Sequence, residues 1–366
     1  MKALTVGGAM VDSIALIADE RIERMSMSNA QSSFLLLEEG RKIEAQEISR
    51  HIGGGAVNAA VAMARLGLDA ATLLKIGQDE RADMILRRLA DEGVSTRWVM
   101  RDARLATGAA VMISSHARDA AIFTFRGANT LLAPDDLAPD MFGVDLVYIS
   151  SLSNESADCF PHIVRLAKAA GAKIATNPGI RQLTSRSGPF QETLCEIDIL
   201  TLNRVEANAL VPQLVALSDD QPVAKLARDA EQDCELLRRD LSSGGHDMAL
   251  PVFMQRLRAC GVGHVLITNG SDGAYLASGD TLYHCPVVPA AVAGTAGAGD
   301  AFAATFASLM VRDDDPVRAL QAAALNAASV IGHADTQTGL LTRDAIEARL
   351  VDHDPMPAVT TWSLVP

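Results

Sequence analysis

The sequence predicts an α/β protein with a doubly wound, mainly parallel sheet and a small inserted β-sheet that forms a lid. Short apolar runs alternate with helical patterns along most of the chain. That alternation is typical of a parallel sheet covered by helices on both faces. Two segments break the alternation with extended patterns, and we expect them to form the lid.

Six apolar runs are predicted to be buried strands of the core: residues 2–6, 71–77, 145–150, 172–177, 198–203 and 264–270. Helical patterns lie between them at residues 58–67, 80–93, 159–171 and 253–261. Several of these patterns end in glycine, which readily adopts the left-handed conformation that closes a helix.

The extended segments and the polar ones set the predicted domain boundaries. Residues 13–50 contain short extended stretches, and residues 107–126 have the pattern of a hairpin whose apolar runs meet at "HARDA". We therefore expect an α/β core of residues 1–12, 51–103 and 127–350 and a discontinuous lid of residues 13–50 and 104–126. Residues 211–250 are expected to be a polar insertion with a helical middle and a mobile loop at "SSGGHD", and residues 351–366 a C-terminal tail.

Charge and composition exclude several classes of partner. The formal net charge of -13 disfavours nucleic-acid binding, because phosphates would be repelled. No apolar run is long enough to span a membrane, and Gly7, Gly8 and Asp12 interrupt the N-terminal run as no signal peptide would allow. The five cysteines have no paired spacing and indicate free thiols in a reducing compartment, so we expect a cytoplasmic protein.

The segment "GTAGAGDAF" (294–302) has one charged residue, Asp300, directly before a helical pattern. The N–H groups of Gly297, Ala298 and Gly299 are unobstructed by large side chains, and the positive end of the helix favours an anion there. A carboxylate beside such an anion hole suits removal of a proton from a hydroxyl that attacks a phosphate. Alternatively, Asp300 only caps the helix and the glycines form a tight turn.

A second glycine cluster opens another helical pattern, in "HIGGGAVNAAVAMARLG" (51–67). It is neither a P-loop nor a dinucleotide fingerprint, because the first needs G-x-x-x-x-G-K-[ST] and Asn58 replaces the third glycine of the second. Glycine residues let a ligand come close to the backbone, and a short amide side chain can form hydrogen bonds with hydroxyl groups. The cluster therefore suits binding of a polyol whose hydroxyls Asn58 bridges. A tight start of the helix is the alternative explanation.

Together the two clusters resemble the signatures of the ribokinase-like, or pfkB, carbohydrate kinases. "AGTAGAGDAFAATF" is similar to that family's C-terminal signature and "GGGAVNAAVAMARLG" to its N-terminal one. Further similar segments follow in the family's order: "VGGAMVD" (6–12), "KIGQDERADMILRRLADEGV" (75–94), "TGAAVMIS", "RGAN" (126–129), "TLNRVEA" (201–207) and "ITNGSDGAYL" (267–276). The resemblance covers residues 2–345.

The resemblance implies roles for individual residues. Asp300 would be the catalytic base, with the backbone of Gly297, Ala298 and Gly299 as the anion hole. For binding of the acceptor, the resemblance implies Asp12, Gly54, Gly55 and Asn58. For binding of ATP it implies Asn203, Thr268, Gly270 and Gly273, and for Mg²⁺ it implies Glu206. From the residues alone, an exposed carboxylate at a helix start is the preferred interpretation of Glu206, and a turn residue that caps the end of the first strand is the alternative for Asp12.

The sequence departs from the family pattern at three places, of which the smallest is "RADM" (81–84), where the glycine usual after G-x-D is missing. Gly294 and Thr295 stand where the family usually has Asp-Thr, and Gly294 has no side-chain ligand for a monovalent cation, so we expect little dependence on K⁺. The segment "SVIGHADTQTGLL" (329–341) also differs, which leaves the adenine pocket without assigned residues.

We therefore predict an ATP-dependent kinase that phosphorylates a hydroxyl of a sugar or sugar-like molecule. The resemblance also implies a homodimer formed through the lid. A nucleoside kinase of the same fold is the alternative, although only Phe34, Phe123 and Phe125 are obvious candidates for stacking on a base. A non-catalytic sugar-binding or regulatory protein is the alternative from another class, because a fold does not fix a function.

Overall fold

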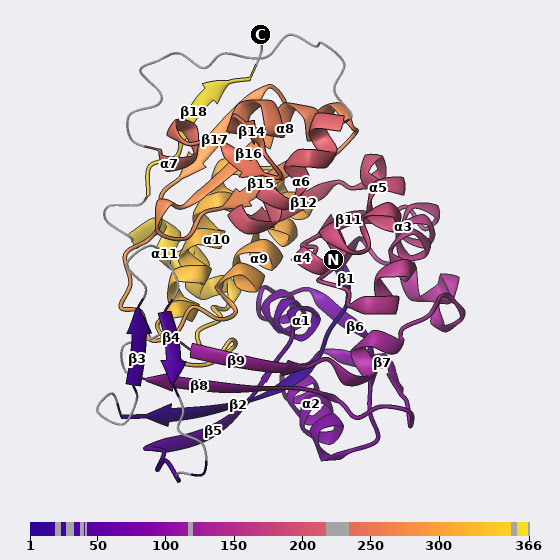
Figure 1. Ribbon diagram of the computed structural model, residues 1–366. Coiled ribbons are helices and arrows are strands. Elements are labelled where there is room, and N and C mark those ends of the chain that lie inside the picture. The colour runs from indigo at the N-terminus through magenta and orange to yellow at the C-terminus, as the bar shows by residue number, and fades with distance from the viewer. Residues whose placement is uncertain are drawn as a thin grey trace.

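The computed structural model describes residues 1–18, 23–26, 33–36, 40, 42–115, 120–216, 234–352 and 357–364. Its centre is a ten-stranded sheet in the order β18-β17-β16-β15-β12-β11-β10-β1-β6-β7 (Figure 1). The strands are β1 (Lys2–Val6), β6 (Asp69–Ile76), β7 (Ser95–Arg101), β10 (Leu146–Ile149), β11 (Lys173–Thr176), β12 (Ile199–Asn203), β15 (His264–Thr268), β16 (Ala274–Ser278), β17 (Thr281–Cys285) and β18 (Thr360–Ser363).

The strands from β15 to β7 pair in parallel, whereas β16, β17 and β18 extend the sheet in antiparallel fashion. The six predicted core strands are confirmed as β1, β6, β10, β11, β12 and β15. Because these strands are parallel, their carboxyl ends share one edge of the sheet. Loops at that edge are the usual place for a ligand site in an open α/β fold.

Helices cover both faces of the sheet, as the apolar runs predict. Neighbouring residues of a strand point to opposite faces: Ala3 packs in one core and Leu4 in the other. The first core is completed by α1 (Gly55–Arg65), α2 (Glu80–Asp91), α9 (Ala298–Asp313), α10 (Pro316–Ile331) and α11 (Arg343–Asp352). The second is completed by α3 (Phe160–Ala169), α4 (Ile180–Thr184), α5 (Ser187–Glu192), α6 (Arg204–Ala216), α7 (Glu235–Arg238) and α8 (Leu250–Ala259).

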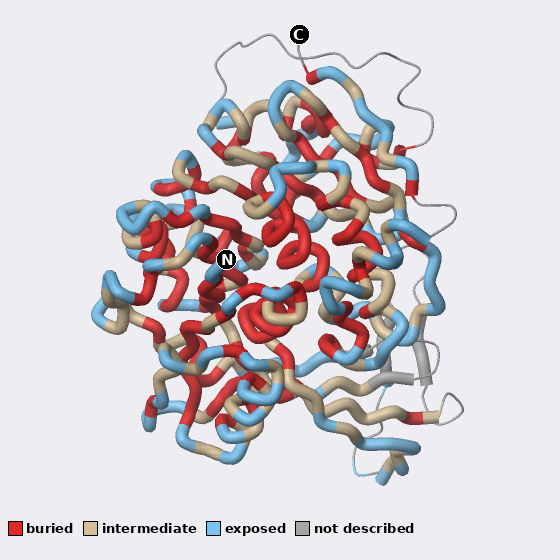
Figure 2. The backbone as a smooth tube through the Cα atoms, turned by 180° about the vertical axis from the view of Figure 1, so that it is seen from behind, coloured by how far each residue is buried: buried red, intermediate tan, exposed pale blue. Residues whose placement is uncertain are grey.

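A separate four-stranded sheet, the lid sheet, projects from one end of the core (Figure 1). Its order is β5 (Glu47–Gly53), β2 (Met10–Ile17), β8 (Gly108–Ser115) and β9 (Ala120–Phe125). Much of its backbone is exposed or only partly buried, whereas the core helices are largely buried (Figure 2). A two-stranded pair, β3 (Glu23–Ser26) with β4 (Ser33–Leu36), also lies within residues 13–50.

The lid boundaries in the structure differ from the predicted ones by a few residues. β2 begins at Met10 and β5 ends at Gly53, so residues 10–12 and 51–53 belong to the lid sheet rather than to the core. The predicted hairpin is formed by β8 and β9. Residues 116–119 of its "HARDA" turn lie outside the described residues.

Residues 211–250 are not simply a polar insertion. Their first six residues complete α6, where Val211 and Leu214 are buried in the second core. The "SSGGHD" segment is an ordered hairpin of β13 (Leu241–Ser243) and β14 (His246–Met248), because Gly244 and Gly245 take the positive φ angles, 60° and 80°, of a tight turn. The predicted helical middle falls mainly on residues 217–233, outside the described residues.

The predicted C-terminal tail also contains core structure. Residues 351–352 end α11, and β18 adds an edge strand to the central sheet beside β17. Leu282 of β17 lies opposite Trp362 of β18 and is fully buried. The edge strand therefore covers an apolar part of the sheet.

Candidate active site

The loop before α9 presents Asp300 at the carboxyl edge of the sheet. Gly297 is the N-cap residue with a left-handed φ of 80°, and an added Cβ would lie 2.6 Å from Cβ of Thr336. Only glycine fits this turn without strain. Asp300 is the third residue of α9, yet no side chain of the described residues caps this helix. The alternative that Asp300 serves as a simple helix cap is therefore wrong.

Asp300 is held instead by an amide from the other glycine cluster. Nδ2 of Asn58 donates a hydrogen bond of 2.8 Å to Oδ2 of Asp300. Oδ1 of Asn58 accepts from Thr336 Oγ1 at 2.9 Å and from Gln337 Nε2 at 3.0 Å. These contacts fix which way the amide faces, and they use most of its hydrogen-bonding capacity. Burial raises the pKa of Asp300, while the Asn58 hydrogen bond lowers it.

The N-terminal glycine cluster lies against Asp300. Gly54 takes a φ of 100°, and an added Cβ would lie 2.5 Å from the carbonyl oxygen of Gly8. A Cβ on Gly55 would lie 2.9 Å from Cβ of Ser150 and 3.4 Å from Oδ1 of Asp300. The free oxygen of Asp300 therefore faces a strip of backbone without side chains. Such a strip can admit a small hydroxylated molecule.

Asp12 lies on the lid side of the same region. Oδ2 of Asp12 would be 2.4 Å from a Cβ on Gly53, and His51 is its neighbour across β2 and β5. Burial raises the pKa of Asp12, and the charge of His51 lowers it. Asp12 is a member of the lid sheet, so it is not a turn residue at the end of the first strand.

The amides of Ala298, Gly299 and Asp300 belong to the first turn of α9. The first bond of this helix runs from the Ala301 N–H to the Gly297 carbonyl, at 2.9 Å. The preceding amides therefore have no acceptor within the helix, as at any helix start. A Cβ on Gly299 would meet no described atom within 4 Å, so this backbone is open to a ligand.

Glu206 takes part in a capping box at the start of α6. The Asn203 N–H donates to Oε2 of Glu206, and the Glu206 N–H donates to Oδ1 of Asn203, both at 2.9 Å. Glu206 is only 9% exposed, so the alternative of an exposed carboxylate is wrong. Burial raises its pKa to about 7, and the charge of Asp300 adds to this against the hydrogen bonds from Asn203.

Thr268 and the turn after β15 lie next to Asn203. Asn203 and Thr268 are paired residues at the ends of β12 and β15. Gly270 and Gly273 take positive φ angles, and a Cβ on Gly273 would lie 2.2 Å from the Cys285 carbonyl oxygen. The predicted nucleotide residues thus lie together at the carboxyl edge of the sheet.

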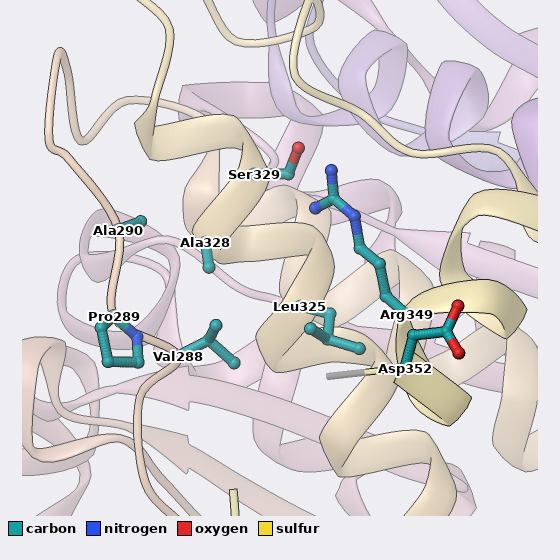
Figure 3. Close-up of a pocket in the computed structure, with 8 residues that line it drawn as sticks. All are labelled: Val288, Pro289, Ala290, Leu325, Ala328, Ser329, Arg349 and Asp352. Atoms are coloured by element: carbon teal, nitrogen blue, oxygen red, sulfur yellow. The ribbon is translucent and has the colours of Figure 1, made fainter. Parts of the chain in front are cut away.

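A cavity of about 370 Å³ lies beyond this turn, between the loop after β17 and the helices α10 and α11. Figure 3 shows Val288 and Leu325 among its lining residues, with Arg349 extending from α11 towards Ser329. The loop that leads from the cavity to Gly297 is tied to α10, because Ala293 N–H donates to the Ile331 carbonyl at 2.7 Å. Sequence reasoning left this pocket unassigned.

Sequence reasoning also missed Thr336 and Gln337, which hold Asn58. Both lie in the segment 329–341 that departs from the family pattern. Their polar side chains are nearly buried, but the segment has no periodicity to reveal it. Their shared partner, Asn58, lies 278 positions before Thr336 and 279 positions before Gln337.

Among the described residues, no group of three or more His, Cys, Asp and Glu side chains is arranged to hold a metal ion. The described helices likewise include none long and apolar enough to cross a membrane.

Comparisons with known proteins identify relatives of this chain. The sequence profile of pfkB family carbohydrate kinases matches residues 23–234 and 245–343. A deoxyribokinase of Salmonella typhi is 25% identical over 330 residues, which cover 89% of this chain and 94% of that protein.

Solved structures show the same fold. A ribokinase of Arabidopsis thaliana, complexed with ribose and ATP, has a TM-score of 0.70 at 22% identity, covering 96% of this chain and 98% of that one. A nucleoside kinase of Methanocaldococcus jannaschii, an archaeal member of the ribokinase family, has a TM-score of 0.71 at 20% identity, with 96% and 99% covered. The chain belongs to the pfkB family of carbohydrate kinases and is an ATP-dependent sugar kinase.

Proposed function

We propose that this kinase uses Asp300 to deprotonate the acceptor hydroxyl during phosphoryl transfer from ATP. The observation that carries the proposal is that Asp300 starts a helix without capping it and is oriented by Asn58, which leaves Oδ1 facing the Gly55 backbone. The acceptor hydroxyl would donate its proton to Oδ1. Its oxygen would form the new bond to the γ-phosphorus while the bond to the bridging oxygen breaks and ADP leaves.

The raised pKa of Asp300 supports this role. A base works best when its pKa lies close to the operating pH, and burial moves the pKa of Asp300 in that direction. The open amides of Ala298, Gly299 and Asp300, at the positive end of α9, would take up negative charge on the transferring group. This assigns the anion hole to the backbone and the proton transfer to one side chain.

The residues near α6 fit a magnesium ion that accompanies ATP. Mg²⁺ usually keeps several waters and takes one or two carboxylates together with substrate phosphates. The capping box uses Oε2 of Glu206, so Oε1 is the oxygen that would accept a metal-bound water. When bound, the ion would neutralise phosphate charge. Asn203 and Thr268, paired at the strand ends, would lie beside the phosphates.

The cavity beside Val288 and Leu325 would hold the adenine ring. It has the volume for a flat base, its walls are largely apolar, and Ser329 and Arg349 add polar groups at its rim. The Gly270–Gly273 turn lies close to it, because Gly273 packs against the Cys285 carbonyl just before the loop that lines the cavity. Thr268, Gly270 and Gly273 would then connect the base to the phosphates.

The acceptor would bind between the lid sheet and the core. Asp12 and the Gly54–Gly55 backbone would hold it on the side that faces Asp300. Asn58 would orient Asp300 rather than bridge acceptor hydroxyls, because its amide already makes three hydrogen bonds within the protein.

A sugar is the favoured acceptor. The named activity of the Salmonella relative, at 25% identity, is that of a deoxyribokinase. The nucleoside kinase neighbour shares only the fold at its level of identity. Phe123 and Phe125 are 59% and 48% exposed, and the side chain of Phe34 lies outside the described residues. Phe123 and Phe125 therefore do not form a buried aromatic wall that could stack on a nucleobase.

We also infer a homodimer formed through the lid sheet, in the cytoplasm. Ile48, Val111, Phe123 and Phe125 are all exposed, and the strand register puts them on one face of this sheet. A second lid sheet would bury them. None of the five cysteines, all of which lie in the described part of the chain, forms a disulfide, as a reducing compartment favours.

ATP turnover against a panel of sugars and nucleosides tests the proposed function. We expect ADP release with at least one sugar and its loss in Asp300→Asn. A protein that binds a sugar tightly but releases no ADP with any acceptor would contradict catalysis.

A further inference from the structure

A second cavity, of about 540 Å³, lies where β9 of the lid sheet meets the core. Polar residues among its lining are Thr124, Arg126, Thr130, Asn154 and Arg181. Two arginines in one cavity give it a positive character. The proposed proton transfer does not use either of them, so the cavity needs a separate explanation.

Neither arginine is neutralised. In the described part of the chain no carboxylate forms an ion pair with Arg126 or Arg181, and the one hydrogen bond found for the guanidinium group of Arg126 is donated to Ser153 Oγ, at 2.8 Å. A neighbouring arginine behaves differently, because Arg186 pairs with Asp158 at 2.6 Å. Glu155 lines the adjoining cavity with Arg181 but forms no ion pair with it within the described residues.

The two guanidinium groups are also close enough to affect each other. Burial, and then the charge of Arg181, lower the pKa of Arg126. Bringing two like charges together, one of them partly buried, is unfavourable unless an anion is bound between them. Guanidinium groups bind carboxylates and phosphates well because their N–H donors match the spacing of two oxygens.

The cavity lies on the acceptor side of the lid sheet. Asp12, Ala110 and Thr124 are directly opposite one another on β2, β8 and β9, so their side chains share one face. Two strand spacings separate Asp12 from Thr124, which is about 10 Å. That length matches a sugar chain with a charged group at its far end.

The core side of the cavity lies at the edge that also carries Asp300. Ser153 and Asn154 follow β10, and Arg181 lies in α4, which follows β11. Ser150, also after β10, packs beside Gly55 and thus near Asp300. A molecule with its hydroxyl at Asp300 would extend along this edge towards the arginines.

We propose that the acceptor is an anionic sugar, whose carboxylate or phosphate binds between Arg126 and Arg181 while its reacting hydroxyl lies at Asp300. The inference rests on the proposed phosphoryl transfer and specifies the substrate class. Thr124, Thr130 and Asn154 would complete the contacts to the charged group. The negative group is thereby kept away from the anion hole that the γ-phosphate needs.

Matched acceptors test the substrate class. We would measure kcat/KM for glucose against gluconate, fructose against fructose 6-phosphate, and ribose against ribose 5-phosphate. We expect an anionic member to exceed its neutral partner by at least about tenfold, the scale of one or two charge-assisted hydrogen bonds. Preference for gluconate would assign the site to a carboxylate, and preference for a sugar phosphate to a phosphate.

Variants test the two arginines. Arg181→Gln and Arg126→Gln should lower the anionic-to-neutral ratio of kcat/KM by about 10- to 100-fold, chiefly through KM. Arg181→Lys should recover part of the ratio, because it restores charge without the bidentate geometry. Arg186→Gln is the control, since it removes a nearby arginine that is already paired, and it should leave the ratio unchanged.

A binding measurement separates this inference from the proposed function. Calorimetric titration of Asp300→Asn with gluconate and with ribose 5-phosphate should show binding that Arg181→Gln weakens, although the protein does not turn over. If neutral sugars are phosphorylated as well as anionic ones and Arg181→Gln leaves the ratio unchanged, the inference is wrong while the kinase function stands. If no acceptor of the panel gives ADP but the anions bind through Arg181, the proposed function fails instead.

Discussion

The helices α6 and α9 both carry a carboxylate in their first turn, but the two carboxylates have different hydrogen-bond partners. Each helix has a carboxylate as its third residue, Glu206 in one and Asp300 in the other, at the carboxyl edge of the same sheet. Glu206 exchanges hydrogen bonds with the N-cap residue Asn203. Asp300 follows a glycine N-cap with no side chain to exchange with, and it bonds to Asn58 on another helix.

The difference favours Asp300 over Glu206 as the proposed catalytic carboxylate. A carboxylate in a capping box stabilises its own helix and gives up one oxygen to do so. Asp300 makes no such contribution within its helix, and its burial is unfavourable for the charged form. A buried carboxylate that takes no part in capping its own helix is the better candidate for a catalytic group.

The sharpest test of the comparison is Asp300→Asn. Asparagine keeps the shape and can still accept the Asn58 hydrogen bond, but it cannot take up a proton at neutral pH. We expect kcat to fall at least about 100-fold, the scale of losing a general base, with ATP affinity nearly unchanged. Thermal unfolding should show equal or higher stability, because a buried charge is removed. A variant that loses stability but keeps its turnover would identify Asp300 as structural.

Substitutions at Gly297 and Gly299 distinguish the effect of the shape of the loop from the effect of its open amides. Gly299→Ala should leave the melting temperature nearly unchanged, because the added Cβ meets no described atom within 4 Å, yet it should lower kcat/KM for ATP about tenfold by obstructing the anion hole. Gly297→Ala should lower both, since its Cβ would overlap Thr336 at a left-handed φ. Unchanged kinetics in Gly299→Ala would exclude these amides from the anion hole.

Glu206→Gln tests the other helix start. Glutamine preserves the capping box, so any change reports the charge. We expect kcat to fall about tenfold and the Mg²⁺ requirement to rise, as an anionic acceptor for metal-bound water is lost. An unchanged Mg²⁺ titration would limit Glu206 to its structural role.

The pH dependence of stability sharpens the same comparison. The pKa of Glu206 is raised to about 7 in the folded state, so the folded protein holds a proton there that the unfolded chain has released. The resulting stabilisation is complete below the ordinary pKa of glutamate and is lost as the pH rises towards 7. In the absence of Mg²⁺, the free energy of unfolding of the wild type should fall by up to about 3 kcal/mol relative to that of Glu206→Gln between pH 4.5 and 7. Parallel stability curves would contradict the raised pKa.

The smallest expected effect concerns K⁺. Gly294 contributes no carboxylate, so exchanging K⁺ for a large organic cation at constant ionic strength should change turnover by less than about twofold, since cation affinity follows the charge of the ligands. Gly294→Asp should introduce some K⁺ dependence. The residue has no left-handed φ, and its Cβ would lie 3.1 Å from the His333 carbonyl, which requires only a small shift. Strong activation of wild type by K⁺ would show that carbonyl ligands suffice.

The core was predictable because its strands are short apolar runs buried on both faces. β1, β10 and β12 could be located from "KALTV", "DLVYIS" and "DILTLN". The antiparallel strands β16 to β18 could not be placed in the same way. Their position depends on pairing partners such as Leu282 and Trp362, which lie 80 residues apart.

Within the site, glycines and acids were more predictable than their partners. Asp300 and Gly297 stand out because their local pattern is unusual. Thr336 and Gln337 do not, because hydrogen bonding to Asn58 is a property of the folded chain and leaves no local trace. Arg126 and Arg181 were missed for a similar reason, since the absence of a partner cannot be read from a sequence.

The contacts of Asn58 have a consequence for synthesis of the protein. The amide joins Asp300, 242 residues further along the chain, to Thr336, 278 residues further along. Contacts between such distant residues form only after the intervening chain has been made. A nascent chain that ends before Thr336 lacks the hydroxyl and the amide that orient Asn58. The hydrogen bonds that hold Asp300 through Asn58 are therefore completed only after residues 336 and 337 have been synthesised.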